Sequence, residues 1–371
     1  MNNKYLHLFV YLENKTDDKY FGIKKQLSDD PSHLLENIVL SDKSQTIFNK
    51  VEYSSRKLLR EFFYKDVFKE LETKIISRIE SNKNSRHMFI YTLDEGVWSE
   101  FIRFLIKKYK INDVKFINVQ HGFLLNYKKN PLRTKIIKLI NNFYITFFGF
   151  PKFGIGPFHG PFDHYLLFHD EQKKHVIPSA KSISCPNLIN RFFINKFLEI
   201  NNSNYDKKSV LIALQYFVKF GSTSVEMLDF EKTLLSIKPL IKTLNINFKY
   251  KVFLRRHPNM DKNEFSKILS KVNLEKYIIV DTLPLNESIY RSPIIFSLFS
   301  TILFEAKLVS RTPVVIDNKS FNMNLFPIKY QSINLDKDIN QQLEKILNTH
   351  QVIRNYNDEI NWKEIVEHYF D

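Results

Sequence analysis

The sequence predicts an α/β protein built from two doubly wound domains, and three observations support that prediction. The chain has 371 residues, more than one hydrophobic core usually organises, which suggests two domains of roughly 150 to 200 residues each. Short β-rich runs alternate with amphipathic helical patterns in both halves of the chain. Polar clusters follow several of these strands, and parallel sheets bind their ligands at that edge.

The composition is that of a globular protein with anionic partners. Hydrophobic residues make up 43% of the chain and aromatic residues 15%, so both domains can bury a core. The formal net charge of +15 favours a nucleotide-sugar, nucleic acid or an anionic membrane as partner. Lysine and arginine are spread along the chain without a ribonucleoprotein signature, so we do not expect nucleic-acid binding.

Three features bear on localisation. Cys185 is the single cysteine, so it cannot form an internal disulfide, and a reducing cytoplasm fits. The apolar run Tyr5–Leu12 is followed by Glu13 and Lys15, which is typical of a first strand rather than a secretory signal. The uncharged run Leu139–Pro151 is shorter than the roughly 18 to 20 residues that span a bilayer. We expect a cytoplasmic protein, free or peripheral on the inner face of the membrane.

Residues 1–200 are predicted to form an N-terminal Rossmann-like domain on the acceptor side. An aromatic and basic insertion near residues 123–162 interrupts its alternation, and we interpret it as a helix and an ordered loop. We interpret its apolar part either as a buried hydrophobic wall or as a contact for a lipid-linked acceptor. The expected strands are Tyr5–Leu12, Asn37–Leu40, Arg86–Thr92, Val114–Val119 and His164–His169, and the expected helices cover residues 53–81 and 97–110.

Residues 209–335 are predicted to form a C-terminal Rossmann-like domain that holds the nucleotide donor. The polar stretch 201–208 separates it from the first domain. Residues 336–371 are expected to be helical and could pack back across the cleft between the domains. The expected strands are 209–214, 250–254, 277–280, 294–298 and 313–316, and the expected helices are 224–244, 262–272, 285–290 and 300–308.

Ser300-Thr301 is the first candidate for donor binding. The pair follows an apolar strand and opens a helix, where unpaired backbone N–H groups and the helix dipole favour a phosphate. Glu305, one turn further on, could accept from ribose hydroxyls. The alternative is an ordinary helix N-cap.

Arg256-His257-Pro258 also ends a strand. Pro258 restricts His257 to an extended conformation, which aims the imidazole out of the sheet edge, where it can donate to a leaving phosphate. A lone histidine at a strand end can be incidental. Together with the paired hydroxyls of the following βαβ unit, it forms a constellation that favours function.

Two polar triplets end strands of the first half. Asp94-Glu95-Gly96 offers carboxylates where a general base for an acceptor hydroxyl would lie, although acidic turn residues are common. Gln120-His121-Gly122 has the same location, and His121 could bind donor or acceptor, or cap a helix.

Asp336-Lys337-Asp338 looks like a metal-binding pattern but precedes the C-terminal helix, so we interpret it as capping. We therefore predict neither a metal nor a cofactor.

Taken in order, Asp94-Glu95-Gly96, Arg256-His257-Pro258 and Ser300-Thr301 resemble the three short motifs of bacterial sialyltransferases of the GT-B fold. The resemblance implies two Rossmann-like domains facing each other across a cleft, a CMP-sialic acid donor, inversion at the anomeric carbon and no metal. It implies that Asp94 is the general base, that His257 assists phosphate departure, and that the two hydroxyls hold the CMP phosphate. Donor binding would also involve Glu95, Gly96, Arg256, Pro258 and Glu305.

A second resemblance keeps the substrate open. Gln120-His121-Gly122, with Glu305-Ala306 and Pro313–Val315, is similar to capsule and surface-polysaccharide transferases and to CDP-glycerol glycerophosphotransferases. The predicted function is transfer of sialic acid or a related nonulosonate from its CMP form to a hydroxyl of a surface glycan, such as O-antigen, capsule or lipooligosaccharide. One alternative is transfer of glycerol phosphate or another sugar from a CDP or UDP carrier. The non-enzyme alternative is a basic polyanion-binding module.

Overall fold

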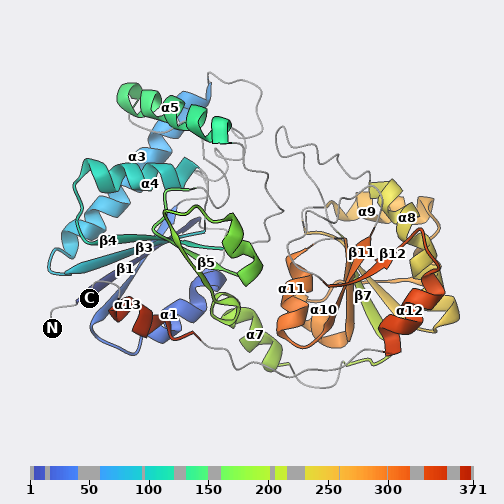
Figure 1. The fold of residues 1–371 in the computed structure, drawn as a ribbon. Helices are drawn as coiled ribbons and strands as arrows, with labels where there is room; N and C mark the ends of the chain where they lie inside the picture. Colours follow the sequence, from blue (N-terminus) through green and yellow to red (C-terminus); the bar gives the residue numbers. More distant parts are fainter. Residues whose placement is uncertain are drawn as a thin grey trace. The chain divides into compact units, whose positions relative to one another are not determined.

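The computed structural model describes residues 4–12, 17–40, 59–93, 97–120, 131–148, 160–200, 205–214, 230–258, 260–298, 300–317, 330–348 and 360–368. The chain divides into two compact units (Figure 1). Unit 1 comprises Met1–Phe192 with Glu359–Asp371, and unit 2 comprises Phe193–Asp358. Within the described residues each unit holds one six-stranded sheet in which every strand pair is parallel. The α/β fold of two doubly wound sheets is therefore confirmed.

The sheet of unit 1 has the strand order β2-β1-β3-β4-β5-β6. Its strands are β1 (Tyr5–Leu12), β2 (His33–Leu40), β3 (His87–Thr92), β4 (Val114–Val119), β5 (His164–Leu167) and β6 (Lys181–Ser184). Its helices are α1 (Phe21–Leu27), α3 (Leu59–Ser81), α4 (Val97–Lys108), α5 (Pro131–Phe148), α6 (Pro186–Ile189) and α13 (Trp362–Glu367), with short 3-10 turns at Asp17–Tyr20 and Asp170–His175. Helix α7 (Arg191–Leu198) spans the boundary between the units.

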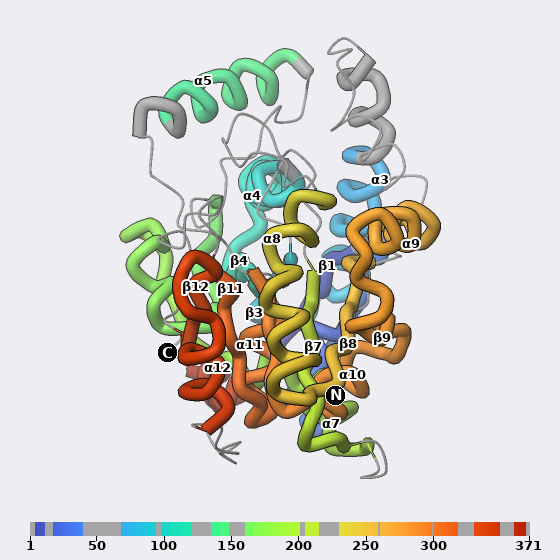
Figure 2. Tube along the Cα trace, turned by 90° about the vertical axis from the view of Figure 1, so that its right-hand side faces the viewer, coloured from blue at the N-terminus to red at the C-terminus, as the bar shows by residue number. Residues whose placement is uncertain are grey.

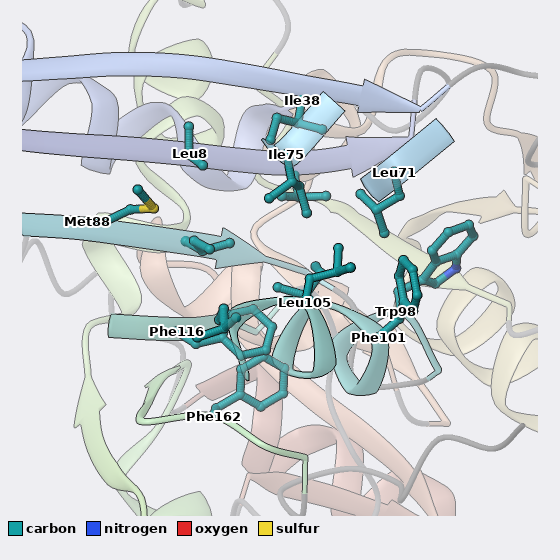
Figure 3. Close-up of a cluster of buried hydrophobic side chains, with 14 of the residues drawn as sticks. Leu8, Ile38, Leu71, Ile75, Met88, Trp98, Phe101, Leu105, Phe116 and Phe162 are labelled. Atoms are coloured by element: carbon teal, nitrogen blue, oxygen red, sulfur yellow. The ribbon is translucent and has the colours of Figure 1, made fainter. Parts of the chain in front are cut away.

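One face of this sheet forms the main core of unit 1 with α3 and α4 (Figure 3). Side chains alternate along a strand, so Leu6, Leu8 and Val10 of β1 share that face. The apolar residues of α4 recur at helical spacing, and Phe101 and Leu105 are fully buried against the strands. Each such side chain contributes about 1.5 to 3 kcal/mol when removed from water, and this fixes the sheet beneath α4.

The opposite face of the sheet holds a chain of buried polar groups among aromatic rings, and the terminal helix α13 packs on it. The indole N–H of Trp362, which is fully buried, donates to the Tyr91 hydroxyl at 3.1 Å. That hydroxyl lies 3.0 Å from His7 Nδ1, and His7 Nε2 lies 2.9 Å from His33 Nδ1. The last described segment of the chain is therefore part of unit 1, whereas α12 (Ile339–Asn348) belongs to unit 2.

The sheet of unit 2 has the strand order β12-β11-β10-β7-β8-β9. Its strands are β7 (Ser209–Ala213), β8 (Lys251–Arg255), β9 (Ile279–Val280), β10 (Ile294–Ser297), β11 (Thr312–Asp317) and β12 (Gln331–Asn334). Its helices are α8 (Phe230–Lys242), α9 (Lys262–Lys271), α10 (Leu285–Arg291), α11 (Thr301–Leu308) and α12, with a π-helical turn at Thr243–Asn247 and a 3-10 turn at Glu275–Tyr277.

Counted in chain order, the strands of unit 2 follow the order 3-2-1-4-5-6 of dinucleotide-binding sheets. Every residue of β7 and β10 is buried, which is typical of a parallel sheet covered by helices on both faces. Helix α11 packs against β10 and α10 against β7, and Figure 2 shows the helices of unit 2 around β7. The continuous apolar runs that predict these two strands are therefore a consequence of their central position.

Some elements differ from the sequence-based expectation. Strands β6 and β12 were not expected, because one has no buried residue and the other has a single one, so neither shows an apolar run. The strand expected at residues 277–280 is reduced to Ile279–Val280 at the sheet edge. The helix expected within residues 123–162 is α5, which lies beyond α4 on the side away from the sheet (Figures 1 and 2). Among the described residues, no helix is long and apolar enough to span a bilayer.

Candidate functional site

The strand order of unit 2 defines where a ligand would lie. From β7 the chain proceeds to β8 and β9 on one side, and then crosses to β10 on the other side. Ligands of such sheets bind at this reversal, outside the carboxyl ends of the two strands. Arg256-His257-Pro258 follows β8 and Ser300-Thr301 follows β10, so both motifs lie at the same edge with β7 between them. Two strand spacings amount to about 10 Å, a span that a nucleoside phosphate can bridge.

Ser300 is the N-cap of α11. Its backbone is extended, with φ −167° and ψ 151°, and its Oγ accepts from the amide of Ile302 at 3.3 Å. The capping interpretation of the sequence is therefore correct, and it does not remove the phosphate site, because a helix N-terminus offers several amides. Ser300 and Thr301 are both partly exposed, while the next residues of α11 are buried against the sheet. The helix is thus fixed in place with its N-terminal hydroxyls at the surface.

Two further groups belong to this end of β10. Ser297, the last residue of the strand, donates from its buried Oγ to the carbonyl of Ala213 at 2.8 Å. This bond ties β10 to β7 where the strand order reverses. Glu305, one turn into α11, is only 9% exposed. Its role in donor binding stays a prediction.

His257 is half-buried after β8, and burial lowers its pKa below the usual 6.5. The imidazole is therefore neutral at pH 7, with one nitrogen donating and the other accepting. Arg256, which the sequence assigns to donor binding, donates from Nη1 to the carbonyl of Met260 at 2.6 Å and to that of Pro258 at 3.2 Å. At least one of its nitrogens thus shapes the loop that carries His257.

A buried charge cluster beside this loop was missed by the sequence reasoning. Asp281, whose side chain is fully buried, accepts from Arg255 Nη1 at 2.8 Å and from Arg291 Nη2 at 2.7 Å. Ser288 Oγ donates to the same carboxylate at 2.6 Å. Because Arg255 directly precedes the motif, the cluster positions the end of β8. The position of Asp281 at the end of a predicted strand could have indicated the cluster. Its partners could not be found from sequence, because they lie up to 26 residues away.

The acidic triplet Asp94-Glu95-Gly96 lies outside the described residues. It connects Leu93, just after β3, to α4. In unit 1 the strand order reverses between β1 and β3, so the triplet follows one of the two strands that flank the ligand-binding edge of this sheet. Its role as a base remains a prediction.

Gln120 is described, whereas His121 and Gly122 lie outside the described residues. The Gln120 side chain is 1% exposed, and its Oε1 accepts from the amide of Phe168 at 2.8 Å. The backbone N–H of Gln120 donates to the carbonyl of Leu166 at 3.0 Å. These bonds join the end of β4 to β5, and they fix the position of Gln120, the residue before His121. A direct ligand contact by Gln120 stays a prediction.

One described group of side chains has the composition of a metal site. Single ligand atoms of Asp30, His33 and Glu367 all lie within 4.8 Å of one another. Lys363 is also present, with Nζ 2.6 Å from Asp30 Oδ2 and 4.0 Å from Glu367 Oε1. Its ammonium already pairs with both carboxylates, so this arrangement serves as an ion-pair anchor for α13.

The Asp336-Lys337-Asp338 pattern caps a helix, as the sequence interpretation predicts. Oδ1 of Asp338 accepts from the amides of Asn340 at 2.9 Å and Gln341 at 3.3 Å, which are the first orphan donors of α12.

Two parallel six-stranded units, each reversing its strand order once, define the GT-B class of two-domain α/β fold. No family model matches the sequence, and no curated protein matches it. Solved structures do match. The UDP-GlcNAc 2-epimerase from Neisseria meningitidis bound to UDP-GlcNAc has a TM-score of 0.58 at 12% identity, covering 98% of this chain and 99% of its own.

Two other solved structures are also similar to nearly the whole chain. The S. aureus MnaA–UDP complex has a TM-score of 0.53 at 13% identity, covering 98% of this chain and 95% of its own. A putative UDP-N-acetylglucosamine 2-epimerase from Listeria monocytogenes has a TM-score of 0.55 at 10% identity, with 99% and 97% coverage. At these identities the similarity establishes the GT-B fold along nearly the whole chain.

Proposed function

We propose that this chain is a glycosyltransferase that binds a nucleotide-activated sugar at the reversal point of the unit 2 sheet. One observation carries the proposal. Ser300-Thr301 at the N-terminus of α11 and His257 at the end of β8 share the ligand-binding edge of a 3-2-1-4-5-6 sheet. In this assignment the α11 N-terminus holds the phosphate, Glu305 accepts from the ribose, and the neutral imidazole of His257 donates to the departing phosphate oxygen.

The donor we propose is a CMP-linked nonulosonate, and the reaction inverts the anomeric carbon. The support is the order of the acidic, His-Pro and paired-hydroxyl motifs along the chain. Asp94 would remove the proton from the acceptor hydroxyl while the bond from sugar to phosphate breaks. The acceptor would be a surface glycan assembled at the inner face of the cytoplasmic membrane, and the surplus positive charge would attract the anionic donor.

A second candidate is an enzyme acting on a UDP-sugar. The observation that favours it is the similarity of the fold to solved structures with UDP-GlcNAc or UDP bound. Such an enzyme would use the same phosphate site, because the two candidates differ in the nucleobase and in the fate of the sugar.

A panel of donors separates the candidates. The purified chain is incubated with CMP-sialic acid, CDP-glycerol and UDP-GlcNAc, with and without glycan acceptors, and released nucleotide and rearranged sugar are both measured. We expect acceptor-dependent release of CMP. Conversion of UDP-GlcNAc to its epimer would establish the second candidate instead, and the absence of saturable binding of any of these nucleotides would contradict the enzyme assignment.

Variants test the assigned residues. His257→Ala is expected to lower kcat by about a hundredfold or more, the usual effect of removing one hydrogen-bond donor to the developing charge, with unchanged thermal unfolding. Asp94→Asn is expected to abolish transfer while CMP binding is retained. Full activity in His257→Ala, or loss of CMP binding in Asp94→Asn, would refute the corresponding role.

A further inference from the structure

Helix α5 exposes an apolar stripe. Its side chains Ile136, Leu139, Phe143 and Phe147 are 50%, 74%, 54% and 67% exposed. Their spacing of three, four and four residues places them on one face of the helix, along about 16 Å of its length. These four are among ten large apolar side chains that are exposed in the described part of the chain. No other described element carries such a concentration.

The opposite face of α5 lines a cavity of unit 1 with three polar side chains and Ile145. Lys138, Asn141 and Asn142 line this cavity of about 530 Å³ together with Arg103 and Lys107 of α4. Asn141 is 4% exposed. A surface helix of a globular protein normally turns its apolar face inward, and α5 does the reverse. The stripe is therefore not a part of the unit 1 core.

Charge distinguishes between the possible occupants of the stripe. Residues 123–148 include no aspartate or glutamate and five basic residues, namely Lys128, Lys129, Arg133, Lys135 and Lys138. Two copies of the chain that met stripe to stripe would bring two positively charged segments together, including the exposed Lys135 beside the stripe, which like-charge repulsion disfavours. An anionic bilayer accepts both the apolar face and the flanking cations.

We infer that α5 is a membrane-docking helix, which lies in the interface of an anionic bilayer with Ile136, Leu139, Phe143 and Phe147 among the acyl chains. Lys135, which is exposed beside the stripe, is the described cation that would meet lipid phosphates, whereas Lys138 lines the cavity on the other face. The inference deepens the proposed function and rests on it, because a membrane-bound acceptor is what requires docking. Unit 1, the acceptor side, would thereby be held at the surface on which the glycan is assembled.

Vesicle sedimentation tests the inference with the full-length chain. Vesicles of phosphatidylcholine alone and of phosphatidylcholine with phosphatidylglycerol are compared at low and high salt. The wild type is expected to sediment with the anionic vesicles, and less so at high salt. Leu139→Glu is expected to weaken partitioning by about tenfold or more, the effect of removing one buried leucine.

The matched control is Leu235→Glu on α8, where a leucine is 47% exposed outside the stripe. It is expected to sediment like the wild type. Because both leucines are exposed, both variants should keep the wild-type thermal transition. Lys135→Glu is expected to reduce binding to the anionic vesicles and to leave any binding to neutral vesicles unchanged.

Three results would overturn the inference. They are absence of wild-type sedimentation with anionic vesicles, equal loss in Leu139→Glu and Leu235→Glu, and a dimer in light scattering that Leu139→Glu dissociates, since a second copy would then cover the stripe. Nucleotide binding is measured in every variant. Docking that fails while nucleotide binding persists contradicts only the role of α5, and docking that persists without nucleotide binding contradicts only the proposed function.

Discussion

The two sheets place their buried polar groups differently. In unit 2 the central strands β7 and β10 are mostly apolar, and Asp281 joins Arg255 and Arg291 at the carboxyl edge, beside the His257 loop. In unit 1 a polar chain of Tyr91, His7 and His33 crosses the middle of the sheet and ends at α13. The first network orients a loop at a ligand-binding edge, and the second attaches a distant segment of the chain. In both networks, hydrogen bonds or ion pairs offset the free-energy cost of burying polar groups, and each network holds one segment of the chain in a defined geometry.

The largest effect is expected from breaking the unit 2 network. Asp281→Ala leaves two arginines without their carboxylate, and removing one partner of a buried ion pair costs about 3 to 5 kcal/mol. Urea unfolding of unit 2 measures the change. The control is Asp206→Ala, which loses an exposed pair with Lys251 at 2.9 Å and is expected to cost less than about 1 kcal/mol. Equal costs in both variants would show that the network does not stabilise the edge.

Acid should affect unit 1 through a buried histidine. Burial lowers the pKa of His164 at the start of β5 from 6.5 to about 4, so the ring is neutral in the folded state. The unfolded chain binds a proton at this histidine below pH 6.5, so the contribution of His164 to the free energy of unfolding falls between pH 6.5 and 4 and levels off below that. The loss is about 2 kcal/mol once partial screening by water is included. His164→Gln should flatten this part of the pH profile, and an unchanged profile would contradict the assignment.

The smallest effect is expected from the end of the unit 1 chain. Trp362→Phe keeps an aromatic ring in the buried site but removes the N–H that donates to Tyr91. The expected cost is about 1 kcal/mol, the net value of one hydrogen bond. In Trp362→Phe, the backbone amides of α13 should exchange hydrogen faster than in the wild type, whereas exchange in the rest of unit 1 should be unchanged. If exchange instead increased throughout the sheet, the polar chain would be part of the core rather than an anchor for α13.

The sequence alone predicted the elements whose burial is continuous. Strands β7 and β10 are wholly buried and mostly apolar because helices cover both faces of their sheet, and the N-cap role of Ser300 follows from its position between a strand and a helix. Strand β12 escaped prediction because it pairs on one side only and buries a single residue. Periodicity reports burial, so an edge strand without burial leaves no pattern.

Local sequence thus determined the two doubly wound sheets, the strand ends that carry polar motifs, and the capping of α11 and α12. Only the tertiary structure decided that β8 and β10 flank β7, that Asp281 joins two arginines, and that α5 turns its apolar face outward. The physical reason is the range of the interactions. Backbone conformation and capping depend on residues a few positions apart, whereas strand order, buried ion pairs and the rotation of a helix depend on contacts between segments far apart in the chain.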